Sequence, residues 1–436
     1  MIAEKIVSNL ENKFDIVEVY IESTKSKEFE LKNSKEFSKS LSIDKGCGIR
    51  VVKNSKEAFA YMSLDDNYKN NIDKITDDIL LSIELSKKLD CDILNKNRER
   101  YARSRGISVK DNKIKNKIYL MDDVAKNFDK KIVDVKGASI AFSEQKFEIA
   151  NSYGMNIKDS KTYVSSSVSV LAQDKTADMG WYSLDADNFE AIDFEYIAQE
   201  ASNRALNKLH PQSISTKKYS IILSSDVFTQ ILAHFFPIFD GYSVINNTTY
   251  LKDKMNDKIF SSEITIEDSV SLKNRPNSVL FDAEGQRRNN TVVVKNGVLK
   301  SFLHNTYTSK MLNMKNSANA KRAGYASSPK VGAFNFHIKP SKKTKKESLI
   351  SQIDGLYISE IMGLHMANNI SGDFSLGVSG FFIHNGEFLS YFKSATFAGN
   401  FFDIMTKIIG ISDNMYFSGS FGSPDIAIAD CVIGGE

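Results

Sequence analysis

Residues 291–300 read TVVVKNGVLK, and this stretch decides the prediction for the second half of the chain. Its three consecutive valines have the β-branched shape that strands favour, and Asn296-Gly297 supplies the two positive-φ residues of a tight hairpin turn. Residues 381–389, FFIHNGEFL, show the same pattern of strand residues on both sides of an Asn-Gly turn, here Asn385-Gly386. Short strands joined by such turns predict a β-dominated C-terminal domain, a sandwich or a barrel.

The first half of the chain mixes helical and strand patterns. The helix-like segments are residues 2–10, 67–89, 114–129 and 186–209. The strand-like segments are 16–21, 28–33, 36–43, 132–150, 162–173 and a hairpin of 49–52 and 58–61 around a turn at 53–56. We expect Asp185 or Asp187 to cap the helix over 186–209 and His210-Pro211 to end it. The predicted fold class is therefore α+β, with a mixed α/β N-terminal domain over 1–210 and a β-rich C-terminal domain over 211–436.

The composition excludes several classes of protein. The 436 residues carry a net charge of only +3, which makes nucleic-acid binding an unlikely function. The three cysteines, Cys47, Cys91 and Cys431, are too sparse for a disulfide framework and suggest a reducing cytoplasm. The sequence contains neither a signal peptide nor an apolar run of membrane-spanning length. We therefore expect a cytoplasmic protein that does not enter the membrane.

Motifs that would carry chemistry unaided are missing. The closest two of the six histidines are 19 residues apart, and the sequence contains neither HExxH nor HExxxH. A GxSxG elbow is also absent. Gly46-Cys47-Gly48 lacks the third glycine of a dinucleotide fingerprint and is expected to form a tight turn or bulge. A helix is predicted over 226–240, interrupted by Pro237, in which His234 is expected to be a satisfied core histidine.

Several segments, in order along the chain, resemble the TldD/PmbA family, known as modulators of DNA gyrase and as TldD/TldE peptidases. The clearest is residues 372–387, GDFSLGVSGFFIHNGE, which is similar to the family's GDFSxGxxGxxIxNGE block. Residues 281–285 (FDAEG), 317–322 (SANAKR) and 46–51 (GCGIRV) resemble three further family elements. The resemblance extends over nearly the whole chain.

The resemblance also implies which branch of the family is present. The TldD branch binds zinc through HExxxH on a helix, where two histidines hold the ion and the glutamate activates water. In this chain Ala233, His234 and Ile238 occupy those three positions. The ending Gly422-Ser423-Pro424-Asp425-Ile426-Ala427-Ile428 resembles that of the PmbA/TldE branch, so Cys431 is not equated with the zinc-branch cysteine.

The resemblance thus implies a PmbA/TldE-like subunit that holds no metal and is inactive alone. The expected partner is a TldD-like subunit that carries zinc, or a second copy of this chain, and together they would enclose an extended peptide substrate. The candidate substrate-facing residues are Asn368, Asn369, Gly372, Asp373 and Ser375, although the glycines here could simply form turns. The alternative is a homodimeric regulator that binds peptides or proteins and cuts nothing; gyrase regulation rests on the family's name alone.

Overall fold

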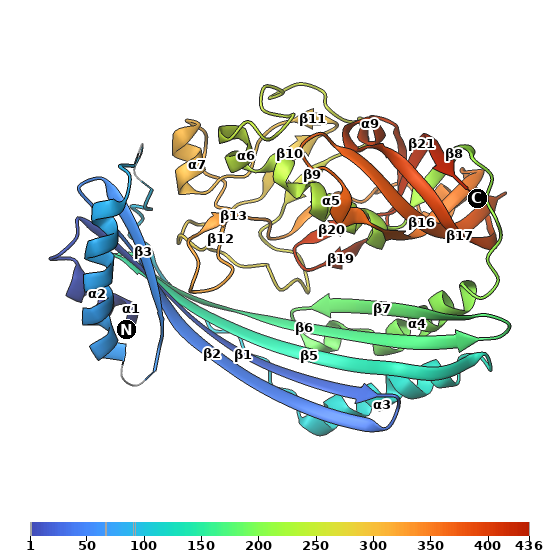
Figure 1. Ribbon diagram of the computed structural model, residues 1–436, viewed down its shortest axis with the longest axis horizontal. Coiled ribbons are helices and arrows are strands. Elements are labelled where there is room, and N and C mark those ends of the chain that lie inside the picture. Colours follow the sequence, from blue (N-terminus) through green and yellow to red (C-terminus); the bar gives the residue numbers. More distant parts are fainter. Residues whose placement is uncertain (1, 66–67, 90, 92, 436) are drawn as a thin grey trace.

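A long, curved β-sheet from the first half of the chain lies beneath a lobe formed by the second half (Figure 1). The computed structural model describes residues 2–65, 68–89, 91 and 93–435. The sheet's strands are β1 (Ile16–Lys32), β2 (Glu36–Lys53), β3 (Lys56–Ser63), β4 (Arg100–Ala102), β5 (Ile132–Asn151), β6 (Asn156–Gln173) and β7 (Ala177–Ala186). They are arranged in the order β3-β2-β1-β5-β6-β4, and β7 also pairs with β6.

Helices cover one face of this sheet. They are α1 (Ile2–Leu10), α2 (Tyr68–Leu85), α3 (Asp111–Lys126) and α4 (Phe194–Asn207), with the short turn η1 (Phe189–Ala191) before α4. On β6, Val164, Val168 and Val170 alternate with polar residues and are fully buried against α3 and α4. At the other end of the sheet, α1 and α2 pack in a separate apolar cluster.

The helix predicted over 186–209 begins later than expected. Asp193, rather than Asp185 or Asp187, caps α4, and its side chain accepts a hydrogen bond from Tyr196 N. Residues up to Ala186 instead complete β7, which pairs with β6 along its whole length. The sequence analysis did not identify this strand, because Asp178, Gly180 and Asp185 interrupt its large apolar residues and leave no clear strand signal.

The second lobe contains many short elements. Its strands are β8 (Lys217–Leu223), β9 (Ile266–Asp268), β10 (Thr291–Lys295), β11 (Val298–Leu299), β12 (Ala320–Lys321), β13 (Lys330–Val331), β14 (Phe336–Ile338), β15 (Gly355–Met362), β16 (Asp373–His384), β17 (Glu387–Asn400), β18 (Ile408–Ile411), β19 (Tyr416–Ser418), β20 (Phe421–Ser423) and β21 (Ile426–Gly434). Its helical segments are α5 (Ser225–Phe235), η2 (Phe236–Phe239), α6 (Gly241–Ile245), α7 (Thr306–Met311), α8 (Lys346–Ser351), η3 (Leu364–Met366) and α9 (Phe401–Thr406).

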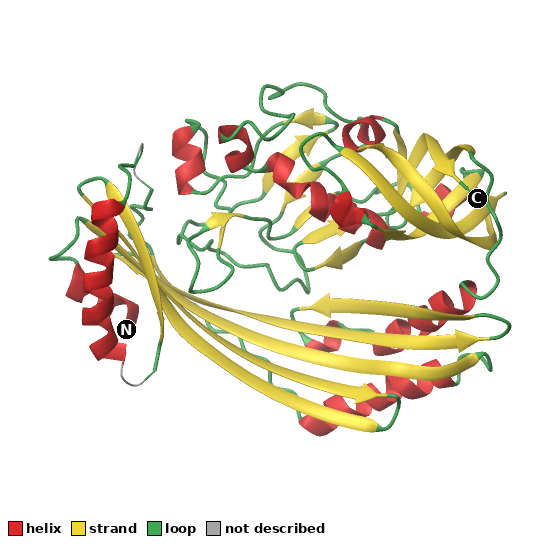
Figure 2. Cartoon of the chain, in the orientation of Figure 1, coloured by secondary structure: helices red, strands yellow, loops and turns green. Residues whose placement is uncertain are grey.

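Five of these strands close into a barrel. The order β17-β16-β15-β8-β21 returns to its start because β21 also pairs with β17, at Phe397↔Ile433. A second sheet, β11-β10-β9-β14-β20-β19, packs beside the barrel, and α5 lies in the apolar core between them. Figure 2 shows strands and loops dominating this lobe, whereas the N-terminal half combines a sheet with helices. The α+β fold class with a β-rich C-terminal region is confirmed.

Both predicted hairpins are present. Asn296 and Gly297 have φ values of 48° and 78° between β10 and β11, and Asn385 and Gly386 have 51° and 82° between β16 and β17. Two consecutive positive φ values are those of the tight turn that Asn-Gly favours. The predicted helix over 226–240 is also present as α5 followed by η2, with Pro237 in the first turn of η2.

The prediction of a turn or bulge at Gly46-Cys47-Gly48 was wrong. These residues lie inside β2 and pair in regular register with both β1 and β3. A Cβ atom on Gly46 would lie 2.2 Å from the Tyr325 ring, and one on Gly48 would lie 2.4 Å from the Tyr325 carbonyl oxygen. The two glycines therefore allow a loop of the second lobe to lie directly on the strand.

None of the helices in the described part of the chain combines the length and apolar character needed to cross a bilayer.

Candidate functional site

The helix α5 and the turn η2 that follows it carry the three positions at which the resemblance places the metal site of the TldD branch. His234 is half-buried, and its Nε2 lies 2.9 Å from the carbonyl oxygen of Ala367. Because a carbonyl can only accept, Nε2 is the protonated ring nitrogen. Ile238, in η2, is only 1% exposed and packs in the core of the lobe, while Ala233 has no donor atom to offer.

These residues do not fit a zinc ion. A hydrolytic zinc site needs about three nitrogen, oxygen or sulfur ligands, and this helix presents one imidazole that is already bonded to the backbone. Among the residues that the structure describes, no three His, Cys, Asp or Glu side chains are grouped so that they could hold a metal. Cys431 on β21 is 3% exposed, and burial raises the pKa of its thiol to about 12, which keeps it protonated at neutral pH.

The candidate substrate-facing residues lie at the start of β16. Asn368 Oδ1 accepts hydrogen bonds from Ile370 N (2.9 Å) and Ser371 N (3.1 Å), and Gly372 N donates to Asn368 O (2.8 Å). This part of the set thus forms one tight turn. Asn369 is half-buried within the turn, and Ser375 is exposed two residues farther along β16 than Asp373.

Asp373 connects this turn to the neighbouring strand β17. Its Oδ1 accepts from Asn400 Nδ2 (2.9 Å) and its Oδ2 from Ser371 Oγ (2.7 Å). These two bonds, that from Asn400 foremost, lower the pKa of the Asp373 carboxyl. Ser371 and Asn400 also line a cavity of about 560 Å³ beside Tyr250 and Lys254, so the turn borders a space open to a ligand.

Replacing Gly372 by alanine should lower the free energy of unfolding by about 2 kcal/mol. Gly372 has φ +87°, and an added Cβ would lie 2.7 Å from the Phe402 ring. Gly154→Ala is the matched control, because Gly154 has φ +95° but no described atom within 4 Å of the added Cβ. That control should lose only about 1 kcal/mol, from the left-handed backbone. Urea unfolding of both variants tests this. An equal decrease in the free energy of unfolding would show that the Phe402 ring moves aside at no cost.

Three of the segments recognised in the sequence meet at the junction of the two lobes. Arg50 comes from GCGIRV, Glu284 from FDAEG and Arg322 from SANAKR, and the side chains of all three are buried. Arg50 Nη1 donates to Glu284 Oε1 (3.3 Å), and Arg322 Nη2 donates to Glu18 Oε1 (2.8 Å). Glu18 lies directly opposite Arg50 in the β1–β2 register. These side chains connect the N-terminal sheet to loops of the second lobe.

Burial governs the electrostatics of this junction. Removal from water raises the pKa of Glu18, whose side chain is only 1% exposed. Burial also opposes the charge on Arg50, but the neighbouring Glu18 and Glu284 carboxylates outweigh it and raise the pKa of Arg50. Each charge is therefore held by its neighbours, and removing one of them would leave another buried without compensation.

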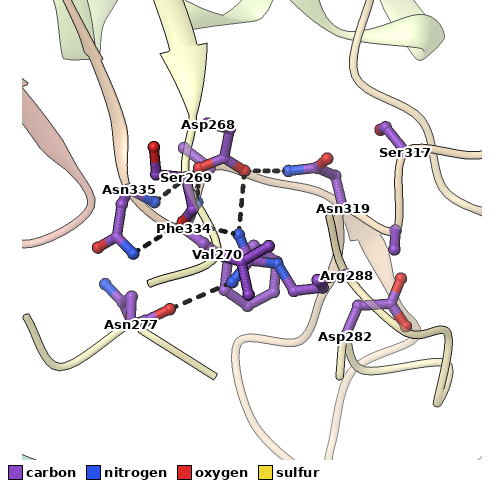
Figure 3. A network of polar contacts seen from close by, with 12 residues as sticks. Asp268, Ser269, Val270, Asn277, Asp282, Arg288, Ser317, Asn319, Phe334 and Asn335 are labelled. Carbon is purple, nitrogen blue, oxygen red and sulfur yellow. Dashed lines mark hydrogen bonds and ion pairs between the residues drawn. The ribbon is translucent and has the colours of Figure 1, made fainter. Parts of the chain in front are cut away.

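A second buried network organises the loops beneath the same segments (Figure 3). Asp268, at the end of β9, accepts from Asn335 N (2.6 Å) and Phe334 N (3.2 Å) through Oδ1. Its Oδ2 accepts from Asn319 Nδ2 and is approached by Arg288 at 3.5 Å. Asn319 belongs to the SANAKR segment, so at least this residue of the segment fixes loops of the second lobe.

The sequence analysis missed Glu18 and a large cavity between the lobes. Strand alternation around Val17 and Val19 assigns Glu18 to the polar face, and that face is in fact covered by the second lobe. The cavity has a volume of about 650 Å³ and lies between α4 and β7 on one side and the barrel on the other. Its lining residues are scattered over the chain, so no local pattern could have revealed them.

Family models and known proteins agree with this architecture. Models of the PmbA/TldA metallopeptidase family match residues 17–82 (domain 1), 78–209 (central domain) and 216–435 (C-terminal domain). The metalloprotease PmbA homolog of Haemophilus influenzae is 25% identical over 318 residues, which cover 72% of this chain and 68% of that protein.

Two crystal structures share the fold. A protein of Thermotoga maritima, named as a modulator of DNA gyrase, superposes with a TM-score of 0.86 at 21% identity. TldE from Thermococcus kodakarensis superposes with a TM-score of 0.86 at 19% identity. Each match covers 99% of this chain and 99% of the other.

Proposed function

Because this chain belongs to the PmbA/TldD (PmbA/TldA) metallopeptidase family, we propose that it acts as the metal-free subunit of a two-subunit zinc peptidase. A TldD-like partner would supply the zinc, and this chain would shape the cavity that receives an extended peptide. The three cysteines are free thiols, which suits a reducing cytoplasm.

One observation supports the metal-free role above all others. On α5 and η2 the ligand positions are taken by Ala233, by a histidine bonded to a backbone carbonyl, and by Ile238 packed in the core. Rebuilding a zinc site here would require two new ligands and the exchange of a buried isoleucine for a polar side chain. The chemistry of hydrolysis is therefore assigned to the partner.

The contribution of this chain would be to bind and orient the peptide. The turn at Asn368–Gly372 borders a cavity of about 560 Å³ through Ser371, and Asn368 and Asp373 hold that turn by hydrogen bonds. A rigid, hydrogen-bonded rim can position an extended chain without the entropy loss of ordering a loop.

Purification with a family member that carries HExxxH tests this proposal. We expect a stable complex with zinc in the partner only, and at least tenfold less peptide cleavage by the partner alone than by the complex. His234→Ala in this chain should leave both the zinc content and the cleavage rate unchanged. Full activity of the partner alone, or one zinc ion per isolated copy of this chain, would refute the assignment.

A homodimeric protein that binds peptides or proteins without cleaving them is the second candidate. It is favoured by the same missing ligands and by the gyrase-modulator name of the Thermotoga maritima relative in structure. The same purification distinguishes the two functions. The second is supported if the chain copurifies only with other copies of itself, binds peptide, and does not increase cleavage by a zinc-bearing relative.

A further inference from the structure

The cavity between the lobes has the chemistry of a binding site. It encloses about 650 Å³, a volume within the range of small-ligand pockets. Its walls come from β7 and α4 of the N-terminal half and from the barrel and the β19 region of the second lobe. Figure 1 shows β7 and α4 directly facing that lobe. It is separate from the turn at Gly372, whose residues line another cavity.

Aromatic rings from both lobes form much of the wall. Tyr182 and Tyr196 meet edge to face with centroids 5.7 Å apart on the N-terminal side. On the barrel side, Phe381 packs against Phe388 (5.2 Å) and Tyr391 (5.1 Å). The faces of such rings carry negative potential and attract cations.

Three cations of the protein already use the rings of this cavity in that way. The Arg204 guanidinium lies 4.7 Å from the Tyr182 centroid, and the Lys346 ammonium lies 5.3 Å from that of Tyr357. Arg275 lies 4.7 Å from the Phe417 centroid. The rings of the wall thus stabilise positive charge. The rings on the barrel side, Phe381, Phe388 and Tyr391, offer further contacts to a cation.

Two carboxylates stand on opposite sides of the cavity. Glu200 on α4 accepts a hydrogen bond from Arg204 at 2.9 Å, and Glu360 on β15 forms an ion pair with Lys208 at 2.6 Å, each through Oε1. In the described part of the chain the Oε2 atoms accept no hydrogen bond and are not among the buried unpartnered atoms, so they face solvent or the cavity. Their side chains are 27% and 31% exposed.

Glu200 and Glu360 each use only one carboxylate oxygen in an ion pair, which leaves the other oxygen for a cationic occupant. The lining includes four carboxylates, of Asp185, Glu200, Asp226 and Glu360, and three cations, of Arg204, Arg275 and Lys346, while Lys208, paired with Glu360, supplies a fourth cation. The Tyr391 hydroxyl is buried on the wall near the Ser359 and Ser379 side chains, but it forms no hydrogen bond of good geometry with the described residues. A ligand N–H would donate to this oxygen once the Tyr391 side chain turns about its Cα–Cβ bond toward the cavity.

We propose that this cavity binds a lysine or arginine side chain of an extended peptide, with the charged end between Glu200 and Glu360 and the aliphatic stem against the aromatic wall. A basic side chain joins an apolar stem to a cationic tip, which matches rings and carboxylates in one site. That the ligand is a peptide rests on the proposed function, whereas the recognition of the cation rests on the cavity alone.

Calorimetric titration of the isolated full-length chain tests the proposal without a partner. The probe is a blocked peptide, Ac-Ala-Ala-Lys-Ala-Ala-amide, and the comparison peptide has norleucine in place of lysine. We expect at least tenfold tighter binding of the lysine peptide, and weaker binding of it as salt increases. Equal affinity for the two peptides, or no binding of either, would overturn the proposal.

Variants of the two carboxylates locate the binding. Glu200→Gln combined with Glu360→Gln should lower the affinity for the lysine peptide at least tenfold. Glu263 is exposed and lies outside the cavity lining, so Glu263→Gln should leave that affinity unchanged. Arg204 keeps Asp226 as a partner at 2.8 Å, so α4 remains tied in the double variant; a thermal unfolding curve verifies this. Tyr391→Phe keeps the ring and should weaken binding through the hydroxyl alone. Unchanged affinity in the double variant would overturn the assignment.

The failure of this inference is distinguishable from failure of the proposed function. If the complex with a zinc-bearing partner is active but the chain does not prefer lysine, the cation site is refuted and the proposed subunit function stands. If the chain prefers lysine but stimulates no partner, the cation site stands and the proposed subunit function is refuted.

Discussion

Replacing Arg322 by alanine should lower the free energy of unfolding by about 3–5 kcal/mol, the effect of breaking a buried ion pair from one side. Arg322 and Glu18 are each 1% exposed, and the bond between them (2.8 Å) connects the two lobes. Without the guanidinium, Glu18 retains Arg50 as its only cationic neighbour among the described residues, at 3.8 Å. Urea unfolding at neutral pH measures the loss.

Two further variants distinguish the cost of leaving the Glu18 carboxylate unpaired from the cost of losing the Arg322 contact itself. Arg287→Ala breaks an exposed pair with Glu99, whose side chains are 57% and 31% exposed, and should cost less than about 1 kcal/mol. Adding Glu18→Gln to Arg322→Ala removes the uncompensated carboxylate and should restore about 1–2 kcal/mol. If the double variant is no more stable than Arg322→Ala, the stranded charge is not the cause.

Acidification should destabilise the protein through His304. This side chain is fully buried, its Nδ1 lies 3.2 Å from Thr308 Oγ1, and burial lowers its pKa to about 4. The unfolded chain has a histidine pKa of about 6.5, so it binds one more proton than the native state between pH 6.5 and 4. Stability from neutral His304 is therefore complete above pH 6.5, and about 3 kcal/mol of it is lost as the pH falls to 4.

A difference measurement isolates this contribution. Asp240 precedes Gly241, which lies against the His304 ring, and burial raises the pKa of Asp240 to about 6. Asp240 acts in the opposite sense, because its stabilising protonated form is lost as the pH rises through 6. The stability of wild type minus that of His304→Gln should therefore shrink by about 2–3 kcal/mol between pH 7.5 and 4.5. A constant difference in urea unfolding would contradict the low pKa.

Local patterns carried much of the fold prediction. The Asn-Gly pairs at 296–297 and 385–386 specified their hairpins, because few other dipeptides adopt two positive φ values. Apolar spacing located α3 and α5 because a helix must bury one face. The same approach misread Gly46 and Gly48, since a glycine that makes room for a distant loop looks like one that makes a turn.

The candidate site was accessible to sequence only in part. The positions Ala233, His234 and Ile238 were located through the resemblance, and their chemistry was already clear from the residue types. Their surroundings were not: the hydrogen bond from His234 to Ala367 joins residues 133 positions apart. The substrate-facing roles of Asn368, Asn369, Gly372, Asp373 and Ser375 stay predictions. In addition, Asn368 and Asp373 accept hydrogen bonds that fix a turn.

By itself the sequence determined the residue types: which helix lacks metal ligands, where tight turns occur and which stretches bury an apolar face. Only the tertiary structure decided which of these residues meet. Arg50, Glu284 and Arg322 form one buried junction, and Glu200 and Glu360 face one cavity, although long stretches of chain separate them. The physical reason is that turns and amphipathic periodicity are properties of neighbouring residues, whereas ion pairs and cavities arise from how two lobes pack.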